Sequence, residues 1–162
     1  MKKEQVVQVV TNIQSRIFNS IEEINCGGCG WFAYFMHQAL SGYGIKCELA
    51  ILDREKIDER LDTINNFRNT RDINNSNNSD TSFNHCCVVL PMLGLDFDGE
   101  VFEAIEDYGC ALQGYYTIEE MKIALGIGFW NPDFNTDDLP ELAKIISQEC
   151  EKVFGQYELI LT

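Results

Sequence analysis

Two cysteines lie in a glycine-rich segment just before an expected helix. Cys26 and Cys29 belong to the run CGGCG, and the aromatic pattern WFAYFMHQAL follows closely. A thiolate at a helix start is stabilised by unpaired backbone N–H groups and by the positive end of the helix dipole. The glycines allow close approach of a substrate, and N–H groups aimed at a reacting carbonyl oxygen can form an oxyanion hole. The segment therefore predicts either a cysteine nucleophile or a tight turn whose thiols only pack.

A cysteine nucleophile needs a base, which is usually a histidine. The chain has two histidines. His37 follows Cys29 by eight residues on the same expected helix, so it lies roughly 12 Å away, too far to accept the thiol proton. We interpret His37 as a surface histidine or a hydrogen-bonded structural one. His85 begins an apolar strand after a polar loop, where a side chain can face a helix terminus, so it is the predicted base.

The order of these segments resembles a known group of enzymes. CGGCGWFA resembles the active-site segment of papain-like cysteine peptidases, although Gly30 stands as an insertion before Trp31. CGWFAYFMHQALSGYGIKCELAIL, followed by HCCVVL and DGEVFEA, is closer to the small papain-like and transglutaminase-like folds. In that group a cysteine opens a helix, a strand follows, and a histidine leads the next strand into a hairpin. The resemblance covers about Cys26 to Asp107 and implies Cys29 as nucleophile and His85 as base.

The same resemblance implies a third triad residue. Glu103 occupies the matching position, where the group has Asp or Asn, and Asp107 and Asp98 are the alternatives. The third residue would orient the imidazole of His85. The triad would then attack an acyl carbon, so the expected reaction is hydrolysis or acyl transfer at a peptide, isopeptide, amide or thioester bond. A protein or peptide is the expected substrate, and no cofactor or metal is expected.

Two further residues are expected to support the site. A papain-type oxyanion glutamine would stand six residues before the nucleophile, where this chain has Glu23. Asn25 is nearer to Cys29 and is expected to donate to the oxyanion together with the Cys29 N–H. Cys26 matches the cysteine that precedes the nucleophile in the papain pattern.

Other interpretations use the same atoms. Cys26 and Cys29 have a metal-knuckle spacing, and His85 with Cys87 could complete a zinc site. Cys26 and Cys29 could also form a redox dithiol, although a thioredoxin-like fold would need a βαβ unit before them. A fourth interpretation is a papain-like domain without catalysis that serves as a binding or structural protein.

Composition limits the class of protein. The chain has 162 residues, of which 45% are hydrophobic, and this suits a single globular domain over 1–162. Its net charge of −14 argues against a nucleic-acid partner, which needs clustered Lys and Arg. No run is long enough for a membrane span, and the N-terminal residues lack the features of a signal peptide. We expect free thiols and a cytoplasmic location, or a location within a particle assembled in the cytoplasm. The sequence indicates no oligomeric state.

Hydrophobic periodicity predicts an α+β fold in which N-terminal helices pack on a small antiparallel sheet. The resemblance implies that this fold is papain-like. A hairpin turn is expected at Asp98-Gly99, and an Asn-rich mobile loop at about 65–83. The expected helices are 4–22, 30–41, 55–67, 117–126 and 135–155, and the expected strands are 45–53, 85–93, 101–107 and 156–162.

Overall fold

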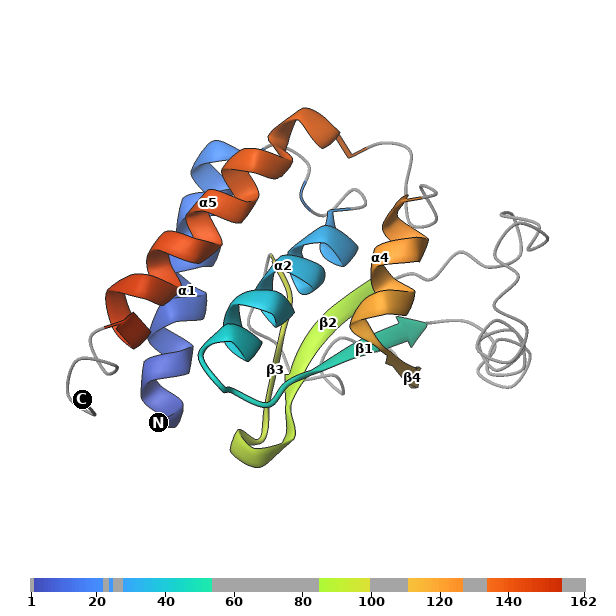
Figure 1. Ribbon diagram of the computed structural model, residues 1–162, viewed down its shortest axis with the longest axis horizontal. Coiled ribbons are helices and arrows are strands. Elements are labelled where there is room, and N and C mark those ends of the chain that lie inside the picture. The colour runs from blue at the N-terminus through green and yellow to red at the C-terminus, as the bar shows by residue number, and fades with distance from the viewer. Residues whose placement is uncertain are drawn as a thin grey trace.

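The computed structural model describes residues 2–21, 24, 28–53, 85–99, 111–126 and 134–155. These residues form an α+β structure, as predicted, with helices packed on an antiparallel sheet of strand order β3-β2-β1-β4 (Figure 1). The helices are α1 (Lys3–Ser20), α2 (Cys29–Gly42), α4 (Ile118–Gly126) and α5 (Leu139–Cys150). The strands are β1 (Glu48–Asp53), β2 (His85–Leu90), β3 (Leu95–Phe97) and β4 (Ala111–Tyr116).

Helix α2 occupies the centre of the described structure. It packs on β2, and it also contacts α4 and α5 (Figure 1). Its buried face includes Phe32, Ala33, Met36 and Leu40, and the ring of Phe32 meets the ring of Phe97 from β3 edge to face. Each large apolar side chain that is fully buried stabilises the folded state by about 1.5–3 kcal/mol. The position of α2 on the sheet is therefore set by the hydrophobic core.

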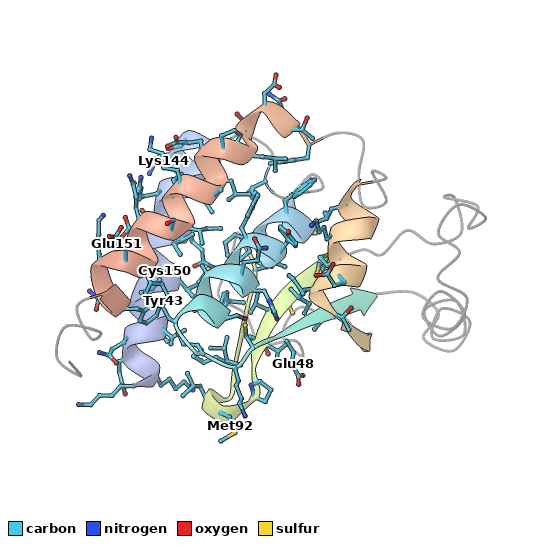
Figure 2. The ribbon with its side chains drawn as sticks, in the orientation of Figure 1. Tyr43, Glu48, Met92, Lys144, Cys150 and Glu151 are labelled. Carbon is cyan, nitrogen blue, oxygen red and sulfur yellow. The ribbon has the colours of Figure 1, made fainter. Side chains whose placement is uncertain are left out.

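Helices α1 and α5 pack against each other beside α2. Both are amphipathic, and the buried residues of α1 are Val6, Val9, Val10, Ile13 and Ile17, at helical spacing. Glu149 of α5 accepts a hydrogen bond from Arg16 of α1 at 2.7 Å and another from Lys152 at 2.6 Å. Figure 2 shows Tyr43 and Cys150 where the ends of α2 and α5 meet, and the Tyr43 ring lies 5.4 Å from that of Phe154.

The hairpin between β2 and β3 differs from the predicted one. Its turn consists of the 3₁₀ turn η2 (Pro91–Leu93) and Gly94, which has a left-handed φ of 59°. The expected strand 85–93 therefore ends at Leu90, because Pro91 cannot donate a hydrogen bond to the sheet. Leu95–Phe97, which we assigned to the approach of a turn at Asp98-Gly99, is itself the short strand β3. The predicted turn at Asp98-Gly99 would lead into residues 100–107, which lie outside the described residues, so it stays a prediction.

Strand β4 was not predicted. It pairs with β1 in antiparallel register, and the register shifts between Ile51 and Leu52. The expected helix 55–67, the Asn-rich loop at about 65–83 and the expected strands 101–107 and 156–162 lie outside the described residues. The last helix is shorter than expected, with a 3₁₀ turn η3 (Thr136–Asp138) before it and a π-helical turn η4 (Glu151–Gly155) after it. None of the described helices combines the length and the apolar composition that a membrane span requires.

Candidate functional site

Cys29 is the first residue of α2. Gly28 precedes it as the N-cap, and the first helical hydrogen bond runs from the Phe32 N–H to the Gly28 carbonyl at 2.9 Å. The N–H groups before Phe32 therefore have no acceptor within the helix, as is general for a helix start. Cys29 is 8% exposed, so its thiol lies at the edge of the core. This is the position at the helix start that the sequence predicted.

Close packing around Gly28 fixes the beginning of this helix. A Cβ atom on Gly28 would lie 2.6 Å from the carbonyl oxygen of Ile24 and 2.9 Å from the ring of Phe134. Contacts this short are not made by real side chains, so only glycine fits between these two neighbours. The glycine that sequence analysis assigned to substrate approach thus also allows the chain before α2 to pack tightly.

The described structure places a second thiol, Cys86, in the same core as Cys29, on the strand against which α2 packs. Successive strand residues point to opposite faces, and Cys86 and Val88 of β2 share the hydrophobic core with Cys29, on the face covered by α2. Burial raises the pKa of Cys86 well above its ordinary value, and the charges of Cys29 and Cys87 raise it further. Sequence analysis did not predict this pair.

His85 is the first residue of β2, where its backbone lies opposite Leu52 of β1. Strand β2 and helix α2 begin at the same end of the molecule and pack on each other (Figure 1). In a regular strand, position 85 belongs to the face of position 87, whereas position 86 faces α2. The side chain of His85 lies outside the described part, so the contact between its imidazole and Cys29 stays a prediction.

Of the three candidate acids, Asp98 is described. It directly follows β3, is 3% exposed, and its main-chain carbonyl accepts a hydrogen bond from Gln14 Nε2 at 3.0 Å. Val88 lies opposite Phe97, so continuing this register would place position 98 opposite position 87 and diagonal to position 85. Glu103 and Asp107 lie outside the described residues, as do Asn25 and Cys26.

The zinc interpretation can be tested on two of its four proposed ligands, Cys29 and Cys87, because their side chains are described. Cys29 lies on the α2 side of β2 together with Cys86, whereas Cys87, the next strand position, belongs to the other face. A zinc ion bound by both Cys29 and Cys87 would require a distortion of the strand. Within the described ranges, no group of three or more His, Cys, Asp or Glu residues is arranged to hold a metal ion.

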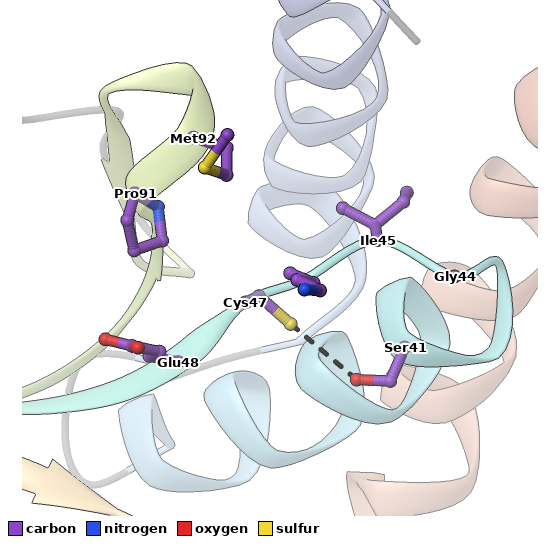
Figure 3. Close-up of a pocket in the computed structure, with 8 residues that line it drawn as sticks. Ser41, Gly44, Ile45, Cys47, Glu48, Pro91 and Met92 are labelled. Atoms are coloured by element: carbon purple, nitrogen blue, oxygen red, sulfur yellow. Dashed lines mark hydrogen bonds between the residues drawn. The ribbon is translucent and has the colours of Figure 1, made fainter.

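A pocket of about 580 Å³ lies at the other end of α2, roughly 18 Å along the helix from Cys29 (Figure 3). It lies between the end of α2, the start of β1 and the β2–β3 turn, and Pro91 and Met92 form one side. Inside it, Ser41 Oγ and Cys47 Sγ are 3.8 Å apart. Burial raises the pKa of Cys47, an effect that the Ser41 hydrogen bond opposes.

His37 lies beside this pocket. Its environment differs in part from the surface or hydrogen-bonded structural histidine that we expected. Its carbonyl accepts a hydrogen bond from Cys47 Sγ at 3.8 Å. Burial lowers the pKa of the His37 imidazole, and a hydrogen bond to the Cys47 backbone partly opposes this. Its Nδ1 is buried and has no hydrogen-bond partner in the described part of the chain, so the imidazole is half-buried and only partly hydrogen-bonded.

Comparisons of this chain with protein-family models, with curated proteins and with solved structures gave no match.

Proposed function

We propose that this protein is a cysteine-dependent hydrolase or acyltransferase of papain-like or transglutaminase-like architecture, with Cys29 as its nucleophile. The observation that carries the proposal is the placement of Cys29 at the start of α2, against the strand whose first residue is His85. Cys29 and Cys86 both belong to the core in which α2 packs on β2, and His85 is the neighbour of Cys86 in the chain. The nucleophile and the base thus come from the ends of two elements that pack on each other.

In the proposed reaction the Cys29 sulfur attacks an acyl carbon, and His85 accepts the thiol proton and later delivers it to the leaving group. The N–H groups of the first turn of α2, with Asn25, stabilise the developing oxyanion. Asp98 is the acid with structural support, because it is buried at the end of the strand that pairs with β2. Glu103 and Asp107 stay candidates on the basis of the sequence.

The proposed substrate is a protein or peptide that carries an amide, isopeptide or thioester bond. The proposed location is the cytoplasm or a particle assembled there. The described cysteines, which are Cys29, Cys47, Cys86, Cys87 and Cys150, are all free thiols. Free thiols are typical of a reducing compartment.

Alkylation by iodoacetamide at neutral pH, followed by peptide mapping, tests the nucleophile. We expect Cys29 to react faster than Cys47, although Cys47 is the more exposed of the two. His85→Ala should slow the reaction of Cys29, because it removes the base, and should leave that of Cys47 unchanged. Equal rates at Cys29 and Cys47 in the unsubstituted protein would show that Cys29 is not activated.

A second candidate function is a papain-like binding or structural protein without catalysis. It is favoured by the burial of Cys29 in the core, and by a strand alternation that turns position 86 toward α2 rather than position 85. The two candidates differ in their reaction with a peptidyl acyloxymethyl ketone, which captures an active cysteine only through acyl recognition. The enzyme forms a stable adduct at Cys29 that Cys29→Ser abolishes, whereas the non-catalytic protein forms none.

A further inference from the structure

Two thiols lie near the beginnings of two elements that pack on each other, and a pair of thiols permits chemistry that a single thiol does not. Cys29 opens α2, Cys86 is the second residue of β2, and the two elements pack directly on each other. Both thiols belong to the same core cluster, and the alternation of β2 turns Cys86 toward α2. Cys29 is 8% exposed and Cys86 is 0% exposed, so a small solute reaches Cys29 first.

We propose that Cys29 and Cys86 form a reversible disulfide when a peroxide oxidises Cys29. The Cys29 thiol first reacts with hydrogen peroxide, the O–O bond breaks, and Cys29 sulfenic acid and one water are formed. The Cys86 sulfur then attacks the Cys29 sulfur, the S–O bond breaks, and the hydroxyl group leaves with the Cys86 proton as a second water. The two thiols together lose two electrons, and the peroxide gains them.

The other described thiols are less suitable partners for Cys29. Cys87 is the next residue of β2 and belongs to the opposite face. Cys47 lies beside the pocket at the far end of α2, roughly 18 Å along the helix. Cys150 ends α5, close to Phe154, which contacts Tyr43 just beyond the end of α2. Among the thiols that the structure describes, Cys86 is therefore the one placed to act as the resolving thiol for Cys29.

The disulfide stands on the geometry alone, whereas its effect on activity rests on the proposed function. A sulfur bound to Cys86 cannot attack an acyl carbon, so the disulfide blocks the proposed enzyme until a reductant restores the thiol. It also stops Cys29 from proceeding to sulfinic acid, which thiol reductants do not reverse. The same disulfide would thus both protect Cys29 from further oxidation and inactivate it as a nucleophile.

The test uses the full chain, reduced, freed of reductant and treated briefly with hydrogen peroxide. Remaining thiols are blocked with N-ethylmaleimide, and the digest is analysed by mass spectrometry without reduction. We expect a peptide pair linked through Cys29 and Cys86, which dithiothreitol removes. Such a link forms only where the two Cα atoms come within about 7 Å. A predominant link between Cys29 and Cys26, or no link at Cys29 at all, overturns the proposal.

Two variants make the result specific. In Cys86→Ala, the linked pair should disappear and sulfinic acid at Cys29 should rise several-fold. The matched control, Cys87→Ala, should keep the linked pair. Formation of sulfinic acid at the same rate in the unsubstituted protein and in Cys86→Ala contradicts a resolving role for Cys86. The readout of this test is a mass, so the disulfide can be detected even in a protein that shows no turnover. Turnover can likewise be measured in a protein that forms no disulfide. The two proposals can therefore fail separately.

Discussion

Cys150 and Cys47 are both free thiols, but their surroundings predict different reactivity. Burial raises the pKa of Cys150 to about 12, and the negative charge of Glu149 contributes. Cys47 is half-buried beside an open pocket, where the Ser41 hydrogen bond opposes the effect of burial on its pKa. We expect Cys47 to react with iodoacetamide at pH 8 at least about tenfold faster than Cys150, since one pKa unit changes the thiolate population tenfold.

The measurement is peptide mapping after timed alkylation of the native protein. The same experiment in concentrated urea is the control, because unfolding exposes both thiols and should make the two rates nearly equal. A native Cys150 that reacts as fast as Cys47 would contradict the environment that the core gives it.

At the scale of single residues, the sequence indicated that Cys29 lies at a helix start, but not which side chains of the next strand turn toward that helix. The glycines followed by an aromatic helical pattern were sufficient to place Cys29 at a helix start. The strand HCCVVL is apolar on both faces, so its pattern does not show which of the adjacent residues Cys86 and Cys87 turns toward the helix. That choice depends on the packing of α2 on β2, which is a tertiary contact.

At the scale of the elements, the two ends of α2 predict opposite effects of the same substitution. Gly28→Ala would place a methyl group 2.6 Å from the Ile24 carbonyl oxygen, so the backbone before α2 must move. We expect a loss of about 1–3 kcal/mol in the free energy of unfolding, the usual cost of overpacking. Urea denaturation followed by circular dichroism measures it.

Gly42→Ala is the matched control for this substitution. Gly42 is the last residue of α2, and a Cβ atom there would meet nothing within 4 Å. Alanine has a higher helix propensity than glycine, so this variant should be as stable as the parent or more stable by up to about 1 kcal/mol. Equal stabilities of Gly28→Ala and Gly42→Ala would show that the chain before α2 is not tightly packed.

The contact between α1 and α5 depends on Glu149. This buried carboxylate accepts hydrogen bonds from Arg16 and Lys152, both of which keep part of their surface in solvent. Glu149→Gln keeps the size and removes the charge, and we expect it to lower the free energy of unfolding by about 1–2 kcal/mol. Glu141→Gln removes the exposed pair with Lys144 and should cost about 0.5 kcal/mol or less. A similar loss in both variants would assign no special role to Glu149.

The effect of Glu149 should also depend on pH. Burial alone raises the pKa of Glu149, but the hydrogen bonds and charges of Lys152 and Arg16 outweigh it, and the pKa lies below its ordinary value. Its contribution is therefore complete above the unfolded-state pKa of about 4.3 and is lost as the pH falls through the folded-state value. The difference in stability between the parent and Glu149→Gln should be full at pH 7 and smaller at pH 3, measured by urea denaturation. A difference that grows at pH 3 would contradict this assignment.

Elements with strong local signals were predicted, and elements that depend on pairing were not. The apolar spacing of Val6 to Ile17 was enough for α1, and Pro140 in the first turn marked the start of α5. Strand β4 has the sequence ALQGYY, in which a glycine and a glutamine weaken the local strand signal. It forms because β1 offers an edge with which it pairs. The β2–β3 turn at Pro91 and Gly94 was missed because Asp98-Gly99 gave the stronger dipeptide signal.

At the scale of the whole molecule, α2 joins the two parts of the structure. It contacts the sheet through β2, the α1–α5 pair through α5, and α4 (Figure 1). Its sequence, CGWFAYFMHQALSG, is apolar over most of its surface, which is typical of a helix surrounded by other elements. The α+β class and the central helix could therefore be predicted, whereas the strand order and the partners of each face required the three-dimensional arrangement.

The net charge of the chain predicts how its stability responds to salt. The sequence has 26 acidic and 12 basic residues and a net charge of −14. Like charges in a compact structure repel each other, and this repulsion is relieved on unfolding. Added salt screens it, since the Debye length falls from about 30 Å at 0.01 M to about 3 Å at 1 M. The same salt weakens ion pairs such as Arg16–Glu149, so the two effects oppose each other.

We expect relief of repulsion to win, because the acidic residues outnumber the basic ones by more than two to one and the Glu149 carboxylate is shielded from solvent. Raising NaCl from about 0.02 M to about 0.5 M at pH 7 should increase Tm by about 2–4 °C, which corresponds to roughly 1 kcal/mol in a chain of this size. Near pH 5 the net charge is closer to zero, since the isoelectric point is about 4.4, and the increase should shrink. A Tm that falls with salt at pH 7 would mean that attractive ion pairs outweigh the acidic surface, and the Arg16–Glu149–Lys152 group would then be the first set of charges to remove.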